Sequence, residues 1–509
     1  MVSLAGDFFY VGTLNLFPPS VSKKKTVQGN SMEANSHQRQ LQHFFWRAGF
    51  GASPDEVKAA LSAPKHRVIK HFIRDSKEVH DFNVVEPMPY FSLRNDKRAM
   101  KVSPIQELDE IKDKLKAVAE ERRESIRNLN DAWVARMGQG TEAFREKMTF
   151  FWHNHFACRS RIALFVQQQN NTLRRHALGK FSDLLMAISK DAAMLQFLNN
   201  QQNRKKSPNE NFAREVMELF TLGRGNYTET DVKEAARAFT GWGFNGSGEF
   251  AFRQLFHDEG PKTIFGKTGN FTGEDVVDML LSNPKTAQFI SAKLYRYFVN
   301  QKVNPEHVEA LTNRFLRTDG DISEVMEYVF TQDWFYAPTN IGAQIKSPVE
   351  LLAGMQRTLQ MDFVDKTPVL YAQKLLGQTL FNPPNVAGWP SGTAWIDSSS
   401  LLTRMQLPKV LFRNEMLAAS VKKSGDANEE AVKRKNKFEV TMNWEKFSSF
   451  FDSFSEQELT EALASHLIQV PINSSLLQQI DKQGSASSRV ERVKQLTVAL
   501  MSIPEYQVC

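Results

Sequence analysis

The residues best suited to chemistry fall in residues 207–242, where Asn, Glu and Arg side chains interrupt apolar segments. Asn211, Glu215 and Glu218 are spaced i, i+4 and i+7, which places them on one side of a helix. Arg214 lies between them. If most of this helix is buried, its carboxylates need partners, protons or a metal ion. The stretch therefore predicts either a paired-carboxylate site or an arginine-satisfied polar network that locks two helices together.

A catalytic interpretation assigns a role to each of these side chains. Glu215 or Glu218 is the general base or a ligand of a hard metal ion, because two carboxylates with different pKa values can divide acid and base work in hydrolysis. Arg214 binds an anion, and His155 is an acid or a metal ligand. Candidates for substrate binding are Asn211, Trp242, His257, Trp389 and Trp395. The alternative function is a non-catalytic scaffold that binds a partner protein or a surface polymer.

A divalent metal ion would draw its ligands from His153, His155 and Glu218. The two histidines lie in TEAFREKMTFFWHNHFA (141–157), whose apolar spacing predicts a helix. Residues i and i+2 of a helix point about 200° apart, so His153 and His155 cannot chelate one ion. The sequence also has no H-E-x-x-H or cysteine-rich metal signature. A buried, hydrogen-bonded role is therefore favoured for each histidine.

Two helices joined by a glycine-rich turn must position the central polar groups. Ser207 followed by Pro208 predicts the start of the first helix. Thr228, with Asp231 three residues later, predicts a capping box at the start of the second. The same device recurs in GNFTGEDVVDML (269–280). The apolar stripe of the first helix consists of Phe212, Val216, Leu219 and Phe220.

Composition fits an ordinary soluble globular protein. The helical spacing of apolar residues along the chain predicts a mainly α fold: a large multi-helix, bundle-like domain with long irregular loops. A short β-hairpin is predicted near 243–257. The net charge of +7 comes from basic residues intermixed with acids, which argues against nucleic acid binding. No apolar run reaches ~18 residues, so no transmembrane segment is expected. Cys158 and Cys509 form no disulfide framework.

Four regions follow from the changes in composition along the chain. Residues 1–36 are expected to be a disordered or mis-assigned extension, with Met1 or Met32 as the true start. Residues 37–420 form the main helical domain, 421–437 a charged flexible linker or loop, and 438–509 a small helical C-terminal unit. The N-terminus lacks the order of a signal peptide, so a cytoplasmic location is expected.

The passage 377–404 is rich in Pro, Gly and Trp and is dominated by turns. A long aromatic loop in a helical protein usually covers another part of the structure. Trp389 and Trp395 either line a cleft for a sugar or polymer or plug the core, and plugging is favoured because Trp is so often buried.

Several motifs occur in an order that resembles a known family. They are RAGFGASPDEV (47–57), FWHNHFA (151–157), PNENFAREVMELFTLGRGNYTETDV (208–232), ARAFTGW (236–242), HDEGPKTIFG (257–266), KLYRYFV (293–299) and NPPNVAGWPSGTAW (382–395). Over about residues 40–410 the chain resembles the bacterial family catalogued as domain of unknown function 1800. The resemblance implies a helical fold and no established activity. It also implies a partner, the product of a neighbouring gene related to alkaline phosphatases and sulfatases.

Overall fold

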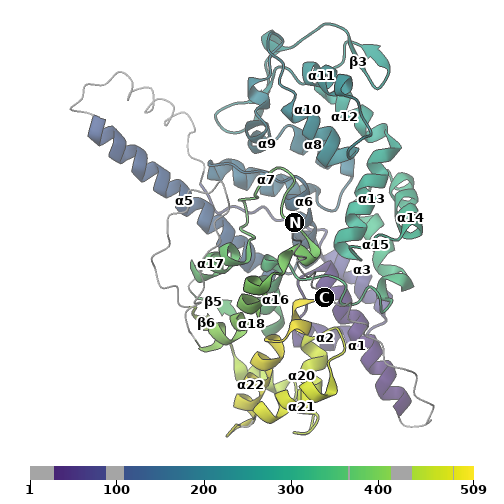
Figure 1. The fold of residues 1–509 in the computed structure, drawn as a ribbon, viewed down its shortest axis with the longest axis vertical. Coiled ribbons are helices and arrows are strands. Elements are labelled where there is room, and N and C mark those ends of the chain that lie inside the picture. Colours follow the sequence, from purple (N-terminus) through teal and green to yellow (C-terminus); the bar gives the residue numbers. More distant parts are fainter. Residues whose placement is uncertain (1–27, 87–107, 365–366, 414–437, 485) are drawn as a thin grey trace, which may run out of the picture.

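The computed structural model describes residues 28–86, 108–364, 367–413, 438–484 and 486–509 (Figure 1). Within these ranges the chain is mainly helical, as predicted. Residues 28–36 belong to the first helix, whereas the rest of the predicted N-terminal extension lies outside the described residues. The predicted linker 421–437 lies outside them as well.

The helices follow one another with few strands between them. The first group is α1 (Gln28–Ala48), α2 (Pro54–Leu61), α3 (Lys65–Asp75), α5 (Leu108–Gln139), α6 (Ala143–His155), α7 (Ala163–His176), α8 (Phe181–Ser189) and α9 (Ala192–Phe197). The second is η2 (Asn200–Gln202), α10 (Asn211–Glu215), the π-helix η3 (Val216–Thr221), α11 (Glu229–Ala238), η4 (Gln254–Phe256), α12 (Gly273–Ser282), α13 (Pro284–Phe298), α14 (Pro305–Arg317), α15 (Ile322–Thr331) and η5 (Asp333–Tyr336). The third is α16 (Pro348–Leu359), α17 (Thr367–Leu376), η6 (Gly392–Trp395), α18 (Ser398–Arg413), α19 (Trp444–Ser449), α20 (Leu459–Leu467), α21 (Ser474–Gln483), α22 (Arg489–Met501) and η7 (Pro504–Gln507).

The strands of the described residues form two-stranded antiparallel pairs. The predicted hairpin near 243–257 is confirmed as β1 (Trp242–Phe244) paired with β2 (Phe250–Phe252). A second hairpin, β3 (Lys262–Ile264) with β4 (Lys267–Gly269), follows it. The pair β5 (Asp362–Phe363) and β6 (Val440–Thr441) joins distant parts of the chain.

Local sequence signals set most of the helix starts around the centre of the molecule. The capping boxes predicted at Thr228 and, by repetition, at Thr272 are both confirmed. The start predicted at Ser207 is wrong, because α10 begins at Asn211 and its N-cap makes no side-chain bond. Ser207 instead pairs with Arg204 in an isolated bridge, so these residues form a turn before the helix.

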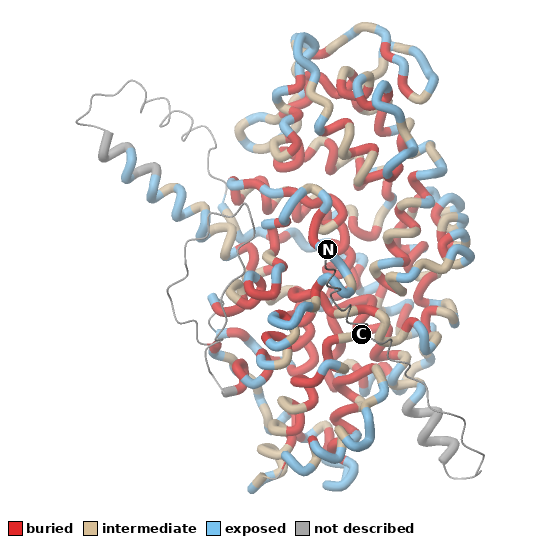
Figure 2. The backbone as a smooth tube through the Cα atoms, in the orientation of Figure 1, coloured by how far each residue is buried: buried red, intermediate tan, exposed pale blue. Residues whose placement is uncertain are grey.

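Two hydrophobic clusters fill the interior (Figure 2). One cluster joins α1, α3 and α6 to α15, and the other joins α5 to α16 and the helices that follow. The helices of residues 438–509 belong to the second cluster, and α20 also packs on α1. These helices therefore pack as part of the body, while the predicted boundary at 438 stays a prediction.

The elements that matter for a site lie in the middle of the molecule. Figure 1 shows α6, α7 and α16 at its centre, α10 to α12 at one end and α20 to α22 at the other. Helix α5 runs outwards from the body, and its buried residues Leu129 and Trp133 lie near its C-terminal end. Tyr297 of α13 packs against both hydrophobic clusters.

Candidate functional site

Ion pairs occupy much of the polar group predicted at residues 207–242. Arg214 donates two hydrogen bonds to Glu229, at 2.8 and 2.7 Å, and one to Glu210 at 3.1 Å. Glu218 accepts hydrogen bonds from Arg224 Nε and the Tyr227 hydroxyl, both at 2.5 Å. These bonds tie α10 and η3 to α11 and the turn before it, which is the arrangement expected of a helix-locking network.

Glu215 is the one carboxylate of this group for which the structure records no hydrogen bond within the described residues, and it is half-buried. Burial raises the pKa of Glu215, and the charge of Glu218 acts in the same direction. The hydrogen bonds from Tyr227 and Arg224 lower the pKa of Glu218. The environment therefore separates the two carboxylates in acidity. Asn211 is exposed and donates to the Leu198 carbonyl at 3.3 Å.

His153 is buried in an aromatic pocket of its own. Its Nε2 accepts a hydrogen bond from the Phe381 backbone N–H at 3.2 Å. Its ring packs against Trp133 and Trp389, with centroids 5.1 and 5.3 Å apart. Burial lowers its pKa to about 3, so the ring is neutral at neutral pH.

His155 turns to a different set of partners, as predicted for a helix. Its Nε2 donates to the Phe220 carbonyl at 3.2 Å, and Nδ1 lies 3.1 Å from Lys293 Nζ. Burial and the charge of Lys293 lower its pKa well below the ordinary value. In the part of the chain that the structure describes, no three His, Cys, Asp or Glu side chains come together in a way that could hold a metal ion.

Trp242 and His257 lie away from both histidines of α6. Trp242 is buried, with Phe239 and Phe250 edge-on to its ring. His257 Nδ1 donates to the Thr240 carbonyl at 2.9 Å, which fixes the turn that follows β2. Both side chains thus have packing roles in the hairpin region.

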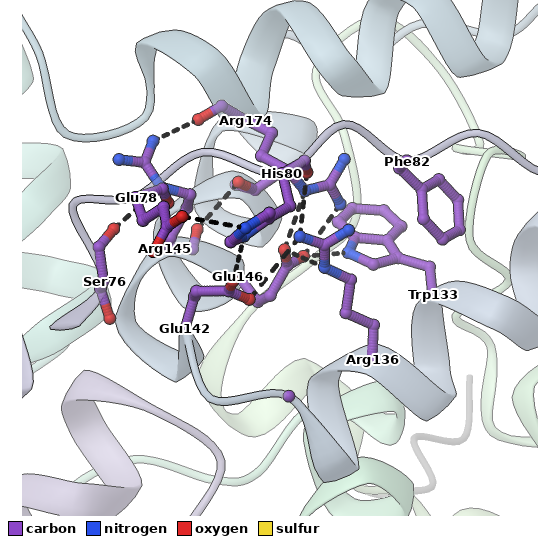
Figure 3. Close-up of polar contacts among 12 residues, drawn as sticks. Ser76, Glu78, His80, Phe82, Trp133, Arg136, Glu142, Arg145, Glu146 and Arg174 are labelled. Atoms are coloured by element: carbon purple, nitrogen blue, oxygen red, sulfur yellow. Dashed lines mark hydrogen bonds and ion pairs between the residues drawn. The ribbon is translucent and has the colours of Figure 1, made fainter.

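The most buried ionic cluster surrounds Glu146 of α6 (Figure 3). Arg174 of α7 holds both carboxylate oxygens, at 2.8 and 2.9 Å, and Trp133 Nε1 donates at 2.8 Å. Arg136 Nε adds a fourth contact at 2.9 Å. Burial raises the pKa of Glu146, but the two arginines outweigh it and the net shift is downward. In Figure 3 Arg145 turns away, toward Ser76, where it donates to backbone carbonyls. This cluster of paired charges joins α5, α6 and α7.

A cleft that is partly open to solvent lies one helical turn further along α6. Lys147, Phe150 and Asn154 of α6 form one wall. Other lining residues come from α13, α16 and the 377–404 loop: Tyr297, Glu350, Gln378, Ser391 and Trp395. The loop predicted to cover part of the protein therefore forms one side of this cleft.

A buried ion pair lies at the base of the cleft. Lys147 Nζ bonds Glu350 Oε1 and also donates to the Trp46 carbonyl at 3.2 Å. Glu350 further accepts from the Tyr297 hydroxyl at 3.2 Å and from the Ser347 N–H at 2.8 Å, where it completes the capping box of α16. Burial raises the pKa of Glu350, but Lys147 outweighs it and the carboxylate is held ionised.

Two side-chain amides of the cleft, those of Asn154 and Gln378, each have an amide oxygen that is already paired. Asn154 Oδ1 accepts from the Trp389 N–H at 2.7 Å, and Gln378 Oε1 accepts from the Val349 N–H at 3.0 Å. Because a backbone N–H fixes each amide oxygen, the NH₂ groups are the free ends. Arg47 also lines the cleft, but its Nε is buried, and Cys509, another lining residue, interacts electrostatically with its guanidinium. The cleft thus offers the NH₂ groups of Asn154 and Gln378 to a ligand that accepts hydrogen bonds.

The two tryptophans of the loop are both buried, as favoured from the sequence. Trp389 packs on His153, whereas Trp395 lines the cleft. The substrate-binding role predicted for them stays a prediction.

Sequence reasoning missed the charged residues that matter most, including Arg47, Glu146, Lys147 and Glu350. A usable signal exists, because each stands among apolar neighbours in a predicted helix, as in FREKMTFFW (144–152) and PVELLAGM (348–355). A charge in such a window must be buried with partners from other helices. Residues 207–242 show the same pattern more densely, so the pattern alone favoured that stretch over these four residues.

Together, fold and cleft define a mainly helical protein with a donor-rich cleft at the junction of α6, α13 and α16. The chain belongs to the family described as protein of unknown function DUF1800, which it matches over residues 43–508. The match extends beyond the predicted 40–410 and includes the helices that close the second hydrophobic cluster. No curated protein and no solved structure matches the chain. Among the described residues no helix is long and apolar enough to cross a membrane.

Proposed function

We propose that the protein is a non-catalytic helical scaffold that captures an acceptor-rich segment of a partner in the cleft between α6, α13 and α16. The observation that carries this proposal is the pair of amide NH₂ groups at Asn154 and Gln378, for which the structure records no partner among the described residues. Carboxylates and backbone carbonyls are the protein groups that accept such hydrogen bonds. The Lys147–Glu350 pair gives the cleft a fixed base, because both ions are already satisfied.

The partner that we propose is the product of the neighbouring alkaline-phosphatase- or sulfatase-like gene. The test is capture of that product by the full-length protein, compared with Ser391→Trp. Ser391 is exposed and lines the cleft, so an indole there obstructs the cleft without disturbing the core. Ser399→Trp is the matched control, because Ser399 is exposed on α18 and does not line the cleft. We expect Ser391→Trp alone to lower capture at least about tenfold, a loss of about 1.4 kcal/mol. Equal capture by all three proteins would rule out this cleft as the binding site.

A second candidate function is hydrolysis at the central carboxylates. It is supported by the opposite pKa shifts of Glu215, which is raised, and Glu218, which is lowered. Groups with separated acidities can serve as general acid and general base. The test is hydrolysis of phosphate, sulfate and carboxylic esters by the wild type and by Glu215→Gln. Activity that Glu215→Gln leaves unchanged would dismiss this assignment.

A further inference from the structure

Lys293 of α13 is a cation that no carboxylate accompanies. Its Nζ donates to the Leu219 carbonyl at 3.1 Å and lies 3.1 Å from His155 Nδ1. The face of the Phe289 ring is 4.8 Å away. Within the described residues no Asp or Glu forms a salt bridge with it, so its charge has only a carbonyl, a neutral ring and an aromatic face as neighbours.

The hydrogen bonds of His155 fix the direction of this contact. Nε2 faces the Phe220 carbonyl and must carry the proton, so Nδ1 presents a lone pair to Lys293. His155 is thus neutral and accepts an N–H of the lysine, which leaves the amine electron pair uncommitted once the ammonium loses a proton.

Lys293 is also reachable. Its side chain is half-buried, so part of it remains in contact with solvent. A small molecule can therefore approach this side chain from solvent.

We propose that Lys293 is a nucleophilic amine that forms an imine with a small aldehyde or ketone, with His155 and the Leu219 carbonyl as its positioning groups. The Nζ lone pair attacks the carbonyl carbon and forms a C–N bond, and proton transfer from nitrogen to oxygen gives a carbinolamine. Loss of the hydroxyl group with the remaining N–H proton releases water and leaves the C=N bond. The step consumes the neutral amine and needs no oxidant or reductant.

The acidity of the ammonium group supports this chemistry. Burial lowers the pKa of Lys293 to about 8, and the positive charge of Arg296 acts in the same direction. An ordinary lysine has a pKa of about 10.4, so near pH 7.5 the neutral fraction of Lys293 is larger by roughly two orders of magnitude. A desolvated lysine is a recognised form of activated nucleophile.

Reductive ethylation of the full-length protein tests the proposal. Acetaldehyde supplies the carbonyl carbon, cyanoborohydride delivers hydride to the imine, and mass mapping of peptides gives a rate for each lysine. The internal reference is Lys285, which is exposed on the same helix. At pH 7.5 we expect Lys293 to be modified at least about tenfold faster than Lys285. As the pH is raised, the rate at Lys293 should reach its plateau at a lower pH than the rate at Lys285. Modification of Lys293 no faster than that of Lys285, or none at all, would overturn the proposal.

A surface substitution separates the electrostatic cause from mere accessibility. Arg296 is exposed, so Arg296→Gln leaves the packing intact and removes a charge that favours the neutral amine. We expect this variant to move the pH midpoint of Lys293 labelling upward. Arg317→Gln, at an exposed position of α14, is the matched control and should leave the midpoint unchanged. A midpoint that responds to neither substitution would contradict the assigned environment.

Discussion

Asp191 is a buried acid that caps a helix although burial disfavours its charged form. Its carboxylate caps α9 by accepting from the Met194 N–H at 3.0 Å, and Gln169 donates to it at 3.1 Å. Burial nevertheless raises its pKa to about 7. An unfolded aspartate has a pKa near 3.9, so above about pH 4 the folded protein retains a proton that the unfolded chain releases. Its contribution to stability is full in acid and is lost as the pH rises toward 7.

Asp191→Asn should therefore stabilise the protein at pH 8 more than at pH 4. The amide oxygen keeps both hydrogen bonds, and no charge has to be buried. We expect a gain on the order of a few kcal/mol in the free energy of unfolding at pH 8 and little change at pH 4. Urea unfolding at both pH values measures it. A gain of equal size at both would show that the effect is not one of titration.

His153 has the opposite effect on the pH dependence of stability. Burial lowers its pKa to about 3, whereas an unfolded histidine titrates near 6.5. Below pH 6.5 the unfolded chain takes up a proton that the folded protein excludes, so the free energy of unfolding decreases as the pH is lowered.

His153→Gln should reduce this acid sensitivity. The glutamine oxygen can accept the Phe381 N–H, and it does not titrate in this range. Between pH 6.5 and 4.5 we expect the variant to lose about 2–3 kcal/mol less stability than the wild type. Thermal unfolding across this range gives the comparison, and parallel curves would contradict the assignment.

At the residue scale, the sequence predicted which kinds of side chain are buried better than it predicted their partners. The separate buried positions of His153 and His155 followed from helical geometry alone. Their partners Phe381 and Lys293 did not, because each lies more than 130 positions away and only tertiary packing brings it near.

Helix α6 is the element on which several others depend. Its Glu146 pairs with arginines of α5 and α7, its Lys147 with α16, and its Asn154 fixes the 377–404 loop. One helix thus orders both the closed ionic cluster and the open cleft.

Glu146→Gln should destabilise the protein strongly. The substitution keeps the shape but leaves Arg174 buried without a counter-charge, while Arg136 keeps only its contact with Glu142 at 3.6 Å. We expect a loss of about 3–5 kcal/mol, seen as an earlier urea midpoint. Glu218→Gln is the control, because its partner Arg224 is largely exposed, and it should cost no more than about 1 kcal/mol. Similar losses in the two variants would contradict the distinction between the buried and the exposed network.

Elements with short-range signals were predictable, and those with long-range causes were not. The capping boxes at Thr228 and Thr272 and the hairpin β1–β2 are written in a few adjacent residues. The π-helix η3 is not, because an extra residue in a helical turn depends on what the surroundings accept. The false start at Ser207 shows that a cap signal loses to a tight turn nearby.

At the scale of the whole molecule, helices α19 to α22 pack as part of the body, because their buried residues belong to the second hydrophobic cluster. Gln42 of α1 donates to the His466 carbonyl of α20 at 2.8 Å, and Lys346 donates to the Tyr506 carbonyl at 2.6 Å. These two contacts link residues that are 424 and 160 positions apart in the sequence.

A protein that ends after Arg413 should therefore not fold. Removal of α19 to α22 exposes apolar faces of α16 and α18 that are now buried. We expect loss of the cooperative thermal transition and increased binding of a hydrophobic dye relative to the full chain. A sharp transition in the shortened protein would instead support an independent main domain.

The π-helix η3 supplies the backbone carbonyls that accept hydrogen bonds from Lys293 and His155. In its wide turn the Leu222 N–H reaches back five residues, to Met217, and the Leu219 and Phe220 carbonyls serve side chains of α13 and α6 instead. Because η3 ends at Thr221, both carbonyls belong to the last helical turn, which has no following amides of its own to pair with them. The end of this helix therefore supplies the acceptors that hold Lys293 and His155 in place.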